Sequence, residues 1–179
     1  MSLFRSYSSI AEVSGRILKP VAEGMPNYSE VVKKLLGEHG ISDIRTQDWY
    51  LLQKFLDTLQ EVLKKYGPFT LFTLGKLVTE SFPYQFDNLQ TALMAVNQIY
   101  QANHRNGDAG YCEVLFYDDK KKRAQMKCKM PYPAEFQRGV LISLLRKYKE
   151  APGFPMAVTI EPNEKGIREE DDHLFEVSW

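Results

Sequence analysis

One pair of side chains in this sequence is suited to bind the carboxylate of a ligand. His104 and Arg105 stand just before Gly107, which favours a turn of the chain. The imidazole of His104 and the guanidinium of Arg105 would therefore both lie at that turn. The same two side chains can instead bind the last carbonyls of a preceding helix, where positive charge is favoured. We interpret them first as helix-capping residues and second as ligand-binding residues.

Cysteine, aspartate and histidine side chains elsewhere in the sequence could form disulfides or bind metal ions. Cys112 and Cys128 are too few for a disulfide scaffold, so we expect free thiols in a cytoplasmic protein. Asp171, Asp172 and His173 carry metal-binding atoms, but neighbours on an extended chain point apart. A zinc site usually needs four ligands at tight spacing. We therefore expect no metal site.

No catalytic motif stands out in the sequence. A nucleophile elbow and a phosphate-binding loop are both missing, so no pairing of Ser, Cys and His has a supporting context. An acid, a base and a substrate cleft cannot be placed together. We expect no catalytic residues and no cofactor, and we do not interpret the protein as an enzyme.

Composition narrows the range of partners. Among 179 residues, Lys and Arg number 23, as do Asp and Glu, so the formal net charge is zero. This balance predicts no nucleic-acid partner and no binding to an anionic membrane, and it leaves little repulsion against self-association. No apolar run approaches the ~20 residues of a membrane span. An apolar signal-peptide region is also missing, so we expect a cytoplasmic location.

The first hundred residues carry helical patterns. Residues 1–27 are ambiguous, and we expect a short helix and loop attached loosely to the body. The clearest seam repeats at spacings of 3 and 4, and it predicts a helix over 49–66. Its members are Trp49, Leu52, Leu56, Leu59, Leu63 and Tyr66. Similar patterns predict helices over 29–36, 69–82 and 88–103.

From Gly110 the apolar period changes to two. Residues 112–116 and 126–130 therefore predict a hairpin, and residues 158–160 and 174–179 predict two further strands. The stretch 130–139 holds two prolines one residue apart, which neither a helix nor a central strand accommodates. We expect a rigid joint there, followed by an amphipathic helix to Tyr148.

These elements predict one α+β domain over residues 1–179. In it, an N-terminal helical subdomain packs on a small antiparallel β-sheet, with a crossing helix after the Pro-Tyr-Pro joint. Gly139 costs that helix roughly 1 kcal/mol relative to alanine. The cost indicates a close contact at Gly139, either with the sheet or with a ligand.

Several short motifs resemble a known group of domains. They are Asp48-Trp49-Tyr50, Gly67 and Gly75, the run from Tyr100 to Gly107 followed by Gly110, the stretch Met130–Gly139 and the terminal Phe175–Trp179. Over roughly residues 40–179 the pattern resembles uncharacterised bacterial domains related to the 4-vinyl reductase sensory domain. That group is similar to haem-NO-binding domains and to TRAPP-type tethering subunits. The resemblance implies a helical subdomain on an antiparallel sheet, a buried cavity for an apolar or planar ligand, and often dimers.

The sequence departs from these relatives at the positions that would bind metal or haem. Where 4-vinyl reductase-like domains commonly have cysteines, this chain has Ala134 and His173. The Tyr-x-Ser-x-Arg signature of haem-NO-binding domains is missing, and no histidine has a recognisable haem context. Because haem iron needs a placed axial ligand, we expect a domain without haem.

Two functional hypotheses follow. The first is a non-catalytic small-molecule-binding or sensory domain with an apolar pocket between helices and sheet, near Tyr132, Phe136 and Gly139. Its ligand-binding residues would be His104, Arg105, Tyr132, Phe136, Arg138 and Gly139. Arg138 has a simpler role as the surface partner of Glu135, three residues earlier. The second hypothesis is a homodimeric assembly module of TRAPP-like fold, and a homodimer is expected in either case.

Overall fold

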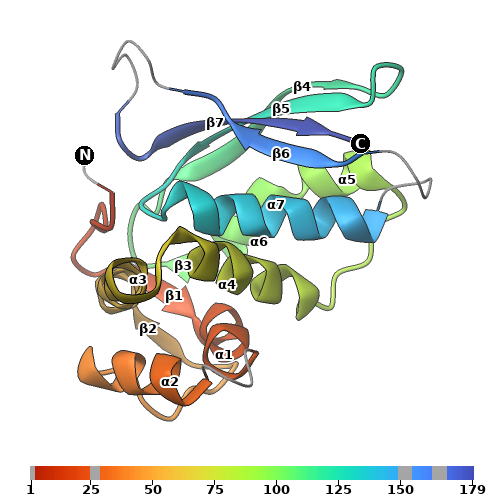
Figure 1. The fold of residues 1–179 in the computed structure, drawn as a ribbon. Coiled ribbons are helices and arrows are strands. Elements are labelled where there is room, and N and C mark those ends of the chain that lie inside the picture. The colour runs from red at the N-terminus through yellow and green to blue at the C-terminus, as the bar shows by residue number, and fades with distance from the viewer. Residues whose placement is uncertain (1–2, 25–28, 149–154, 163–168) are drawn as a thin grey trace.

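The computed structural model describes residues 3–24, 29–148, 155–162 and 169–179. Its helices and two antiparallel sheets confirm the α+β class. Figure 1 shows the larger sheet at the top, with helices α7 and α4 lying beneath it in successive layers and helices α1 and α2 at the bottom. Within the described residues, no helix combines the length and the apolar character needed to cross a bilayer.

The larger sheet is formed by the C-terminal strands in the order β4-β5-β7-β6. Their bounds are β4 Tyr111–Asp118, β5 Arg123–Lys129, β6 Ala157–Ile160 and β7 Asp172–Ser178. All pairs are antiparallel, which confirms the predicted hairpin and sheet. A register shift between Val114 and Phe116 leaves one extra residue in β4. One face of the sheet is buried, because Met126, Phe175 and their alternating neighbours point into the core.

Helix α7 (Ala134–Tyr148) covers the buried face of this sheet (Figure 1). It starts immediately after the joint Met130–Pro133, and the carbonyl of Pro133 accepts from the backbone N–H groups of Phe136 and Gln137. The two prolines therefore end strand β5 and start the helix, as the sequence predicts.

Helix α4 (Pro68–Glu80) packs against the other side of α7. The two backbones approach closely at Gly75 and Gly139. A Cβ atom on Gly139 would lie 2.0 Å from the carbonyl oxygen of Phe72, and one on Gly75 would lie 2.0 Å from that of Phe136. The close contact predicted at Gly139 is therefore made with helix α4, whereas the sequence led us to expect the sheet or a ligand as the partner.

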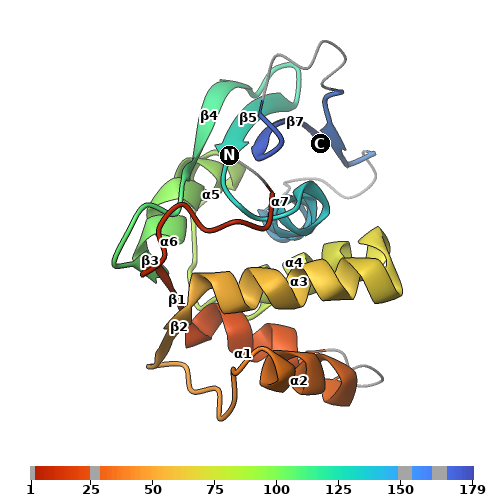
Figure 2. The same ribbon diagram turned by 90° about the vertical axis from the view of Figure 1, so that its left-hand side faces the viewer.

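Helices α1 (Gly15–Glu23), α2 (Ser29–Glu38) and α3 (Leu52–Tyr66) complete the N-terminal part. Figure 2 shows α3 above α1 and α2, on the side of α4. The apolar seam of α3 is fully buried at Leu52, Phe55, Leu56 and Leu59, so it forms core, as its spacing predicts.

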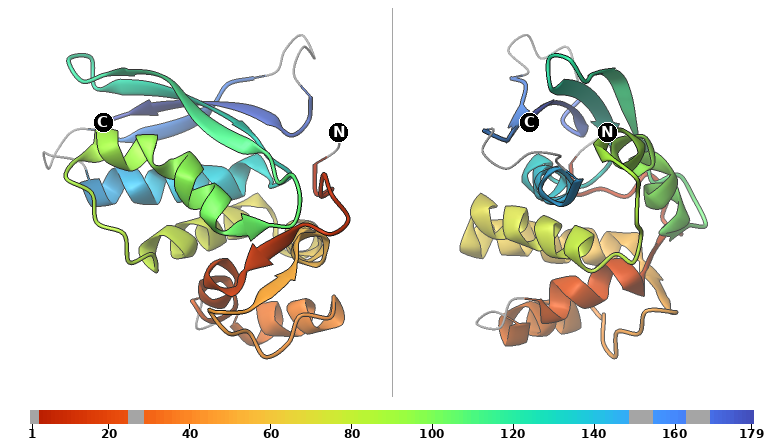
Figure 3. Two further views of the ribbon diagram at one scale, coloured as in Figure 1. Left: turned by 180° about the vertical axis from the view of Figure 1, so that it is seen from behind. Right: turned by 90° about the vertical axis from the view of Figure 1, so that its right-hand side faces the viewer.

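The helix predicted over 88–103 is divided in two. Asn88 caps α5 (Leu89–Met94) through a capping box with Thr91, and α6 (Val96–Ala102) follows after a bend at Ala95. Seen from behind, both helices lie across the edge of the sheet formed by β4 (Figure 3, left). The bend lets the side chain of Asn97 accept from the backbone N–H of Cys112 at 3.1 Å.

The described N-terminal residues are built into the core rather than loosely attached. Strand β1 (Glu12–Ser14) pairs with β2 (Trp49–Leu51) and with β3 (His104–Arg105) in a small second sheet. Residues 49–51 are therefore strand, and helix α3 begins three residues later than the seam predicts. Phe4 donates its backbone N–H to Pro131, and the hydroxyl of Tyr7 donates to Asp171 at 2.5 Å.

Candidate functional site

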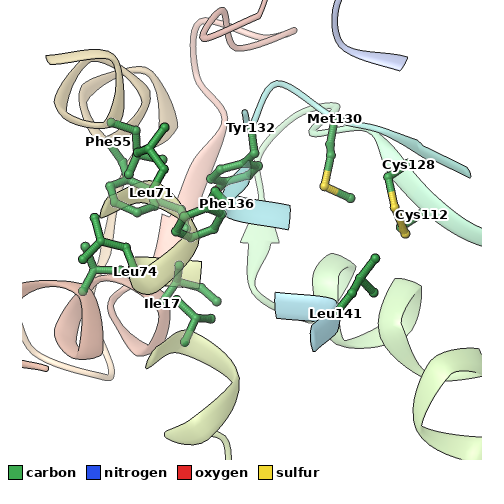
Figure 4. Packing of buried hydrophobic residues seen from close by; sticks show 14 of the residues in the cluster. Ile17, Phe55, Leu71, Leu74, Cys112, Cys128, Met130, Tyr132, Phe136 and Leu141 are labelled. Atoms are coloured by element: carbon green, nitrogen blue, oxygen red, sulfur yellow. A yellow bond between two sulfur atoms is a disulfide. The ribbon is translucent and has the colours of Figure 1, made fainter. Parts of the chain in front are cut away.

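A cavity of about 100 Å³ lies among helices α4, α6 and α7 and the β4–β5 hairpin, and it is partly open, because its wall includes the exposed residue Lys147. Its wall is almost entirely apolar. Figure 4 shows Met130 and the Cys112–Cys128 pair on the sheet side, with Leu141 and Phe136 on the side of helix α7. It lies between helices and sheet and includes Tyr132 and Phe136, and a ligand there stays a prediction.

An aromatic segment, residues 82–86, lies at one end of the cavity. Phe82, Tyr84 and Phe86 all line it, and their ring centroids lie 5.6 and 6.5 Å apart in sequence order. Helix α7 holds this segment through Tyr148 and Lys147. Both side chains donate to the carbonyl of Tyr84, at 3.1 and 3.2 Å respectively.

His104 and Tyr132 form the polar end of the cavity. The His104 Nδ1 atom lies 2.8 Å from the carbonyl oxygen of Tyr100, and Nε2 lies 2.7 Å from the hydroxyl of Tyr132. A carbonyl oxygen only accepts, so Nδ1 must carry the proton. Nε2 of the neutral ring is then the acceptor, and Tyr132 donates to it.

Burial fixes the charge state of this pair. The His104 side chain is 9% exposed, and desolvation lowers its pKa from 6.5 to about 4, against a smaller opposing effect of the bond to Tyr100. Burial also raises the pKa of Tyr132 and of Tyr100. All three groups are therefore neutral near pH 7, and this end of the cavity is polar without carrying charge.

Gln137 is the remaining polar residue in the wall that lies deep in the core. It sits on helix α7 and is 4% exposed. Its Nε2 donates to the carbonyl of Tyr132 at 2.6 Å, which orients the amide, because only the amino group can face a carbonyl. The Oε1 atom is buried and has no hydrogen-bond donor among the described residues.

The other polar side chains in the wall have partners. Thr79 donates to the carbonyl of Val140 at 3.2 Å, and the Tyr100 hydroxyl donates to the carbonyl of Ala109. Together with Lys147 and Tyr148 at the aromatic segment, these groups are satisfied within the protein. Gln137 Oε1 is thus the one buried side-chain acceptor of the described wall that is left without a donor.

Cys112 and Cys128 form a disulfide in the cavity wall. The two residues are directly paired across β4 and β5, with Cα atoms 4.0 Å apart. The expectation of free thiols was wrong for these residues. The reason is the strand register, which brings two residues 16 positions apart into opposite places on the same buried face.

The structure brings together three of the six predicted site residues, His104, Tyr132 and Phe136. His104 also binds the last turn of α6 through the Tyr100 carbonyl, so it has the capping role that we favoured. Tyr132 and Phe136 stack with centroids 5.5 Å apart.

The other three predicted residues lie outside the cavity wall. Arg105 pairs with Glu12 at 2.6 Å and stacks over Trp49, beside a shallow polar hollow at the surface, so the capping role that we expected for it was wrong. Arg138 pairs with Glu135, as the spacing predicts, at 2.7 Å. Gly139 faces α4. Among the described residues, no group of three or more His, Cys, Asp or Glu side chains is arranged to hold a metal ion.

Sequence reasoning missed Gln137 and the aromatic segment. The signal for Gln137 was its spacing: it precedes Leu141 and Leu144 by four and seven residues, so a polar side chain occupies the apolar face of a helix. The aromatic segment has alternating Phe82, Tyr84 and Phe86, a pattern that does not distinguish a cavity wall from ordinary core.

Comparisons with known proteins place the fold. No protein-family model matches the sequence, and no curated protein does. Solved structures of H-NOX domains, the haem-NO-binding domains that the sequence resembles, match over nearly the whole chain. The fold is similar to that of H-NOX domains. A structure from a study of haem distortion in the H-NOX family has a TM-score of 0.66 at 15% identity, covering 93% of this chain and 94% of that one.

Two further H-NOX structures agree. The domain from Shewanella oneidensis in the Fe(II)CO ligation state has a TM-score of 0.61 at 11% identity, with 92% of this chain and 97% of that chain covered. A mutant of the T. tengcongensis domain has a TM-score of 0.59 at 14% identity, with 90% and 94% covered. At such low identity, similarity to H-NOX domains concerns the backbone fold.

Proposed function

We propose that this protein is a non-catalytic small-molecule-binding or sensory domain whose ligand occupies the apolar cavity between α7 and the larger sheet. The observation that supports it is the cavity itself, because concave and mostly apolar sites of this kind are few in a protein and are where small molecules usually bind. The H-NOX-like fold supports the same proposal, since H-NOX domains of similar fold carry haem, and one of them was solved in the Fe(II)CO ligation state.

The ligand of this proposal is small and apolar. An engineered cavity of about 150 Å³ lined by apolar side chains stays dry and accepts benzene or xenon, whereas drug-sized pockets span about 300–1,000 Å³. At about 100 Å³, the cavity suits a guest of benzene size or smaller. Neutral His104 and Tyr132 favour an uncharged guest.

We propose further that the domain works without haem, because the residues at the cavity do not suit that group. Axial ligation needs a histidine nitrogen, alone or together with a methionine, or else a cysteine thiolate or a tyrosine oxygen. In the cavity wall, Cys112 and Cys128 are joined in a disulfide, and the hydroxyls of Tyr100 and Tyr132 have raised pKa values and are hydrogen-bonded within the protein. The Nε2 lone pair of His104 accepts from Tyr132, and Nδ1 carries the proton. His39 Nε2 bonds Glu61 at 2.9 Å, and neither His39 nor His173 lines the cavity.

A cavity-filling variant tests the binding proposal. Val78 and Val62 are both buried helix residues, but only Val78 lines the cavity. We expect Val78→Phe to fill free space, so that the free energy of unfolding changes by less than ~1 kcal/mol while uptake of xenon is lost. The control Val62→Phe should cost about 1–3 kcal/mol and retain xenon uptake.

Xenon uptake is read from shifts of methyl signals of Leu141 and Leu144 in ¹H–¹³C spectra under xenon pressure. Wild-type protein that shows no shift at these methyl groups would overturn the proposal. The homodimeric TRAPP-like alternative stays a prediction. Sedimentation of the full chain at tens of micromolar decides the oligomeric state independently of the cavity.

A further inference from the structure

Gln137 belongs to the cavity wall, and its Oε1 atom, the one side-chain acceptor of the described wall without a donor, indicates a more specific ligand. Gln137 Oε1 is buried in the core, while the other polar side chains of the described wall are paired within the protein. A buried acceptor without a donor costs free energy in the folded protein, so natural proteins usually satisfy such groups. A ligand that supplies the donor would remove that cost.

The orientation of the amide is determined by its partner. Because Gln137 Nε2 lies 2.6 Å from the carbonyl oxygen of Tyr132, exchanging the two amide atoms would place two acceptors against each other. The carbonyl of Tyr132 belongs to the rigid joint ahead of α7, which the His104–Tyr132 bond also holds. Gln137 therefore presents an acceptor, and not a donor, at a position fixed by two further residues.

We infer that the cavity takes a small, neutral and largely apolar molecule of about five- or six-membered ring size that carries one N–H or O–H donor, and that Gln137 Oε1 accepts the hydrogen bond from that donor. This inference rests on the proposed function. The apolar wall and the disulfide would surround the apolar part of the molecule, while Gln137 would accept a hydrogen bond from its single polar group. Ions are excluded because the wall offers no charged partner at its buried end.

Pyrrole and furan form a matched pair of probes for this inference. Both are five-membered aromatic rings, but only pyrrole has an N–H donor. With wild-type protein we expect pyrrole to bind at least about tenfold more tightly than furan, a ratio that corresponds to one satisfied buried hydrogen bond. N-methylpyrrole should lose the advantage, since its nitrogen has no proton. Dissociation constants come from the Leu141 and Leu144 methyl shifts on titration.

Two glutamine variants separate a specific contact from a general effect. Gln137→Met removes the acceptor at similar volume, so the pyrrole-to-furan ratio should fall to about one while furan binding persists. In the control, Gln101 lies on α6 outside the wall and donates its amide to the carbonyl of Gly110 at 2.7 Å. Gln101→Met should leave the wild-type ratio unchanged.

The outcomes distinguish this inference from the proposal on which it rests. Equal binding of pyrrole, furan and N-methylpyrrole by the wild-type protein would overturn the role of Gln137 and leave the cavity as a ligand site. No binding of any probe, together with no xenon uptake, would overturn the proposed function as well. The wild-type comparison needs no variant, so the inference stays testable even where Gln137→Met does not fold.

Discussion

The hydroxyl of Tyr132 and the Nε2 atom of His104 lie 2.7 Å apart in the interior and join two segments separated by 28 residues. Tyr132 belongs to the joint that precedes α7, and His104 belongs to strand β3 of the small sheet. The second ring nitrogen of His104 continues the chain of bonds to the carbonyl of Tyr100 on α6. One imidazole therefore connects three elements that border the cavity.

Removing the hydroxyl of Tyr132 should destabilise the protein. In Tyr132→Phe the Nε2 atom of His104 stays buried without a donor, and we expect a loss of about 1–3 kcal/mol in the free energy of unfolding. Tyr148→Phe is the matched control. Its hydroxyl donates to the Tyr84 carbonyl in a half-buried place, where water can substitute, so the loss should stay below ~1 kcal/mol. Urea unfolding measures both, and equal losses would contradict the buried bond.

The depressed pKa of His104 predicts a dependence of stability on acid. Its pKa is about 4 in the folded protein and near 6.5 when unfolded, so between these values the unfolded chain binds more protons. Stability contributed by the neutral ring is complete above pH 6.5 and is lost as the pH falls towards 4, by roughly 3 kcal/mol in total.

Other groups also titrate in this range, so the test is a comparison. His104→Gln retains one donor and one acceptor but does not titrate there. Wild-type stability should fall relative to this variant in urea unfolding between pH 7 and pH 4. Parallel profiles, or an NMR titration that gives His104 an ordinary pKa, would refute the burial argument.

Replacing a helix glycine with alanine should destabilise the protein where the glycine contacts another helix, and should not where the glycine faces open space. Gly139→Ala would place a methyl group 2.0 Å from the Phe72 carbonyl, so the helices must separate, and we expect a loss above ~2 kcal/mol. Gly37 lies within α2 and has no atom within 4 Å of an added Cβ. Gly37→Ala should be neutral or stabilise by up to ~1 kcal/mol. Chemical denaturation compares them, and a tolerated Gly139→Ala would rule out the close helix crossing.

The disulfide should contribute to stability through the loop that it closes. Cys112 and Cys128 are 16 residues apart, and linking a loop of that size stabilises by about 3 kcal/mol in the chain-entropy description. A reducing agent should therefore lower the midpoint of urea unfolding. The double variant Cys112→Ser/Cys128→Ser has no disulfide, so the reducing agent should not change its midpoint of urea unfolding. Alkylation of the unreduced, denatured protein checks the bond, since two labelled thiols per chain would contradict it.

Local periodicity was sufficient to predict the main elements. The helices α3, α4 and α7 and the β4–β5 hairpin follow from apolar spacings of 3.6 and 2, which depend on near neighbours in sequence. Strands β1, β2 and β3 have only two or three residues each and pair with one another over distances of 35 residues or more. Segments so short carry no periodic signal of their own.

The disulfide was unpredictable for a related reason. The hairpin register places Cys112 opposite Cys128 only because of the extra residue between Val114 and Phe116. Without that bulge the partner of Cys112 would be Lys129, one position along. The residues around Leu115 have no sequence pattern that predicts a bulge at this position.

The candidate site was half predictable. His104 and Arg105 are adjacent on strand β3, so period-two alternation turns His104 into the core and Arg105 to the surface, where it meets Glu12. Tyr132 and Phe136 line the same cavity because the joint fixes the start of α7, and their role in ligand binding stays a prediction. The unsatisfied oxygen of Gln137 depends on side-chain packing from several elements, which one sequence does not display.

The contacts of Phe4 and Tyr7 have a consequence for synthesis on the ribosome. Their partners, Pro131 and Asp171, are translated more than 120 residues later. Helices α1 to α4 can pack once they have been synthesised, whereas the backbone bond of Phe4 and the side-chain bond of Tyr7 form only after Pro131 and Asp171 have emerged. Folding of this domain is thus completed by contacts whose two sides are synthesised far apart in time.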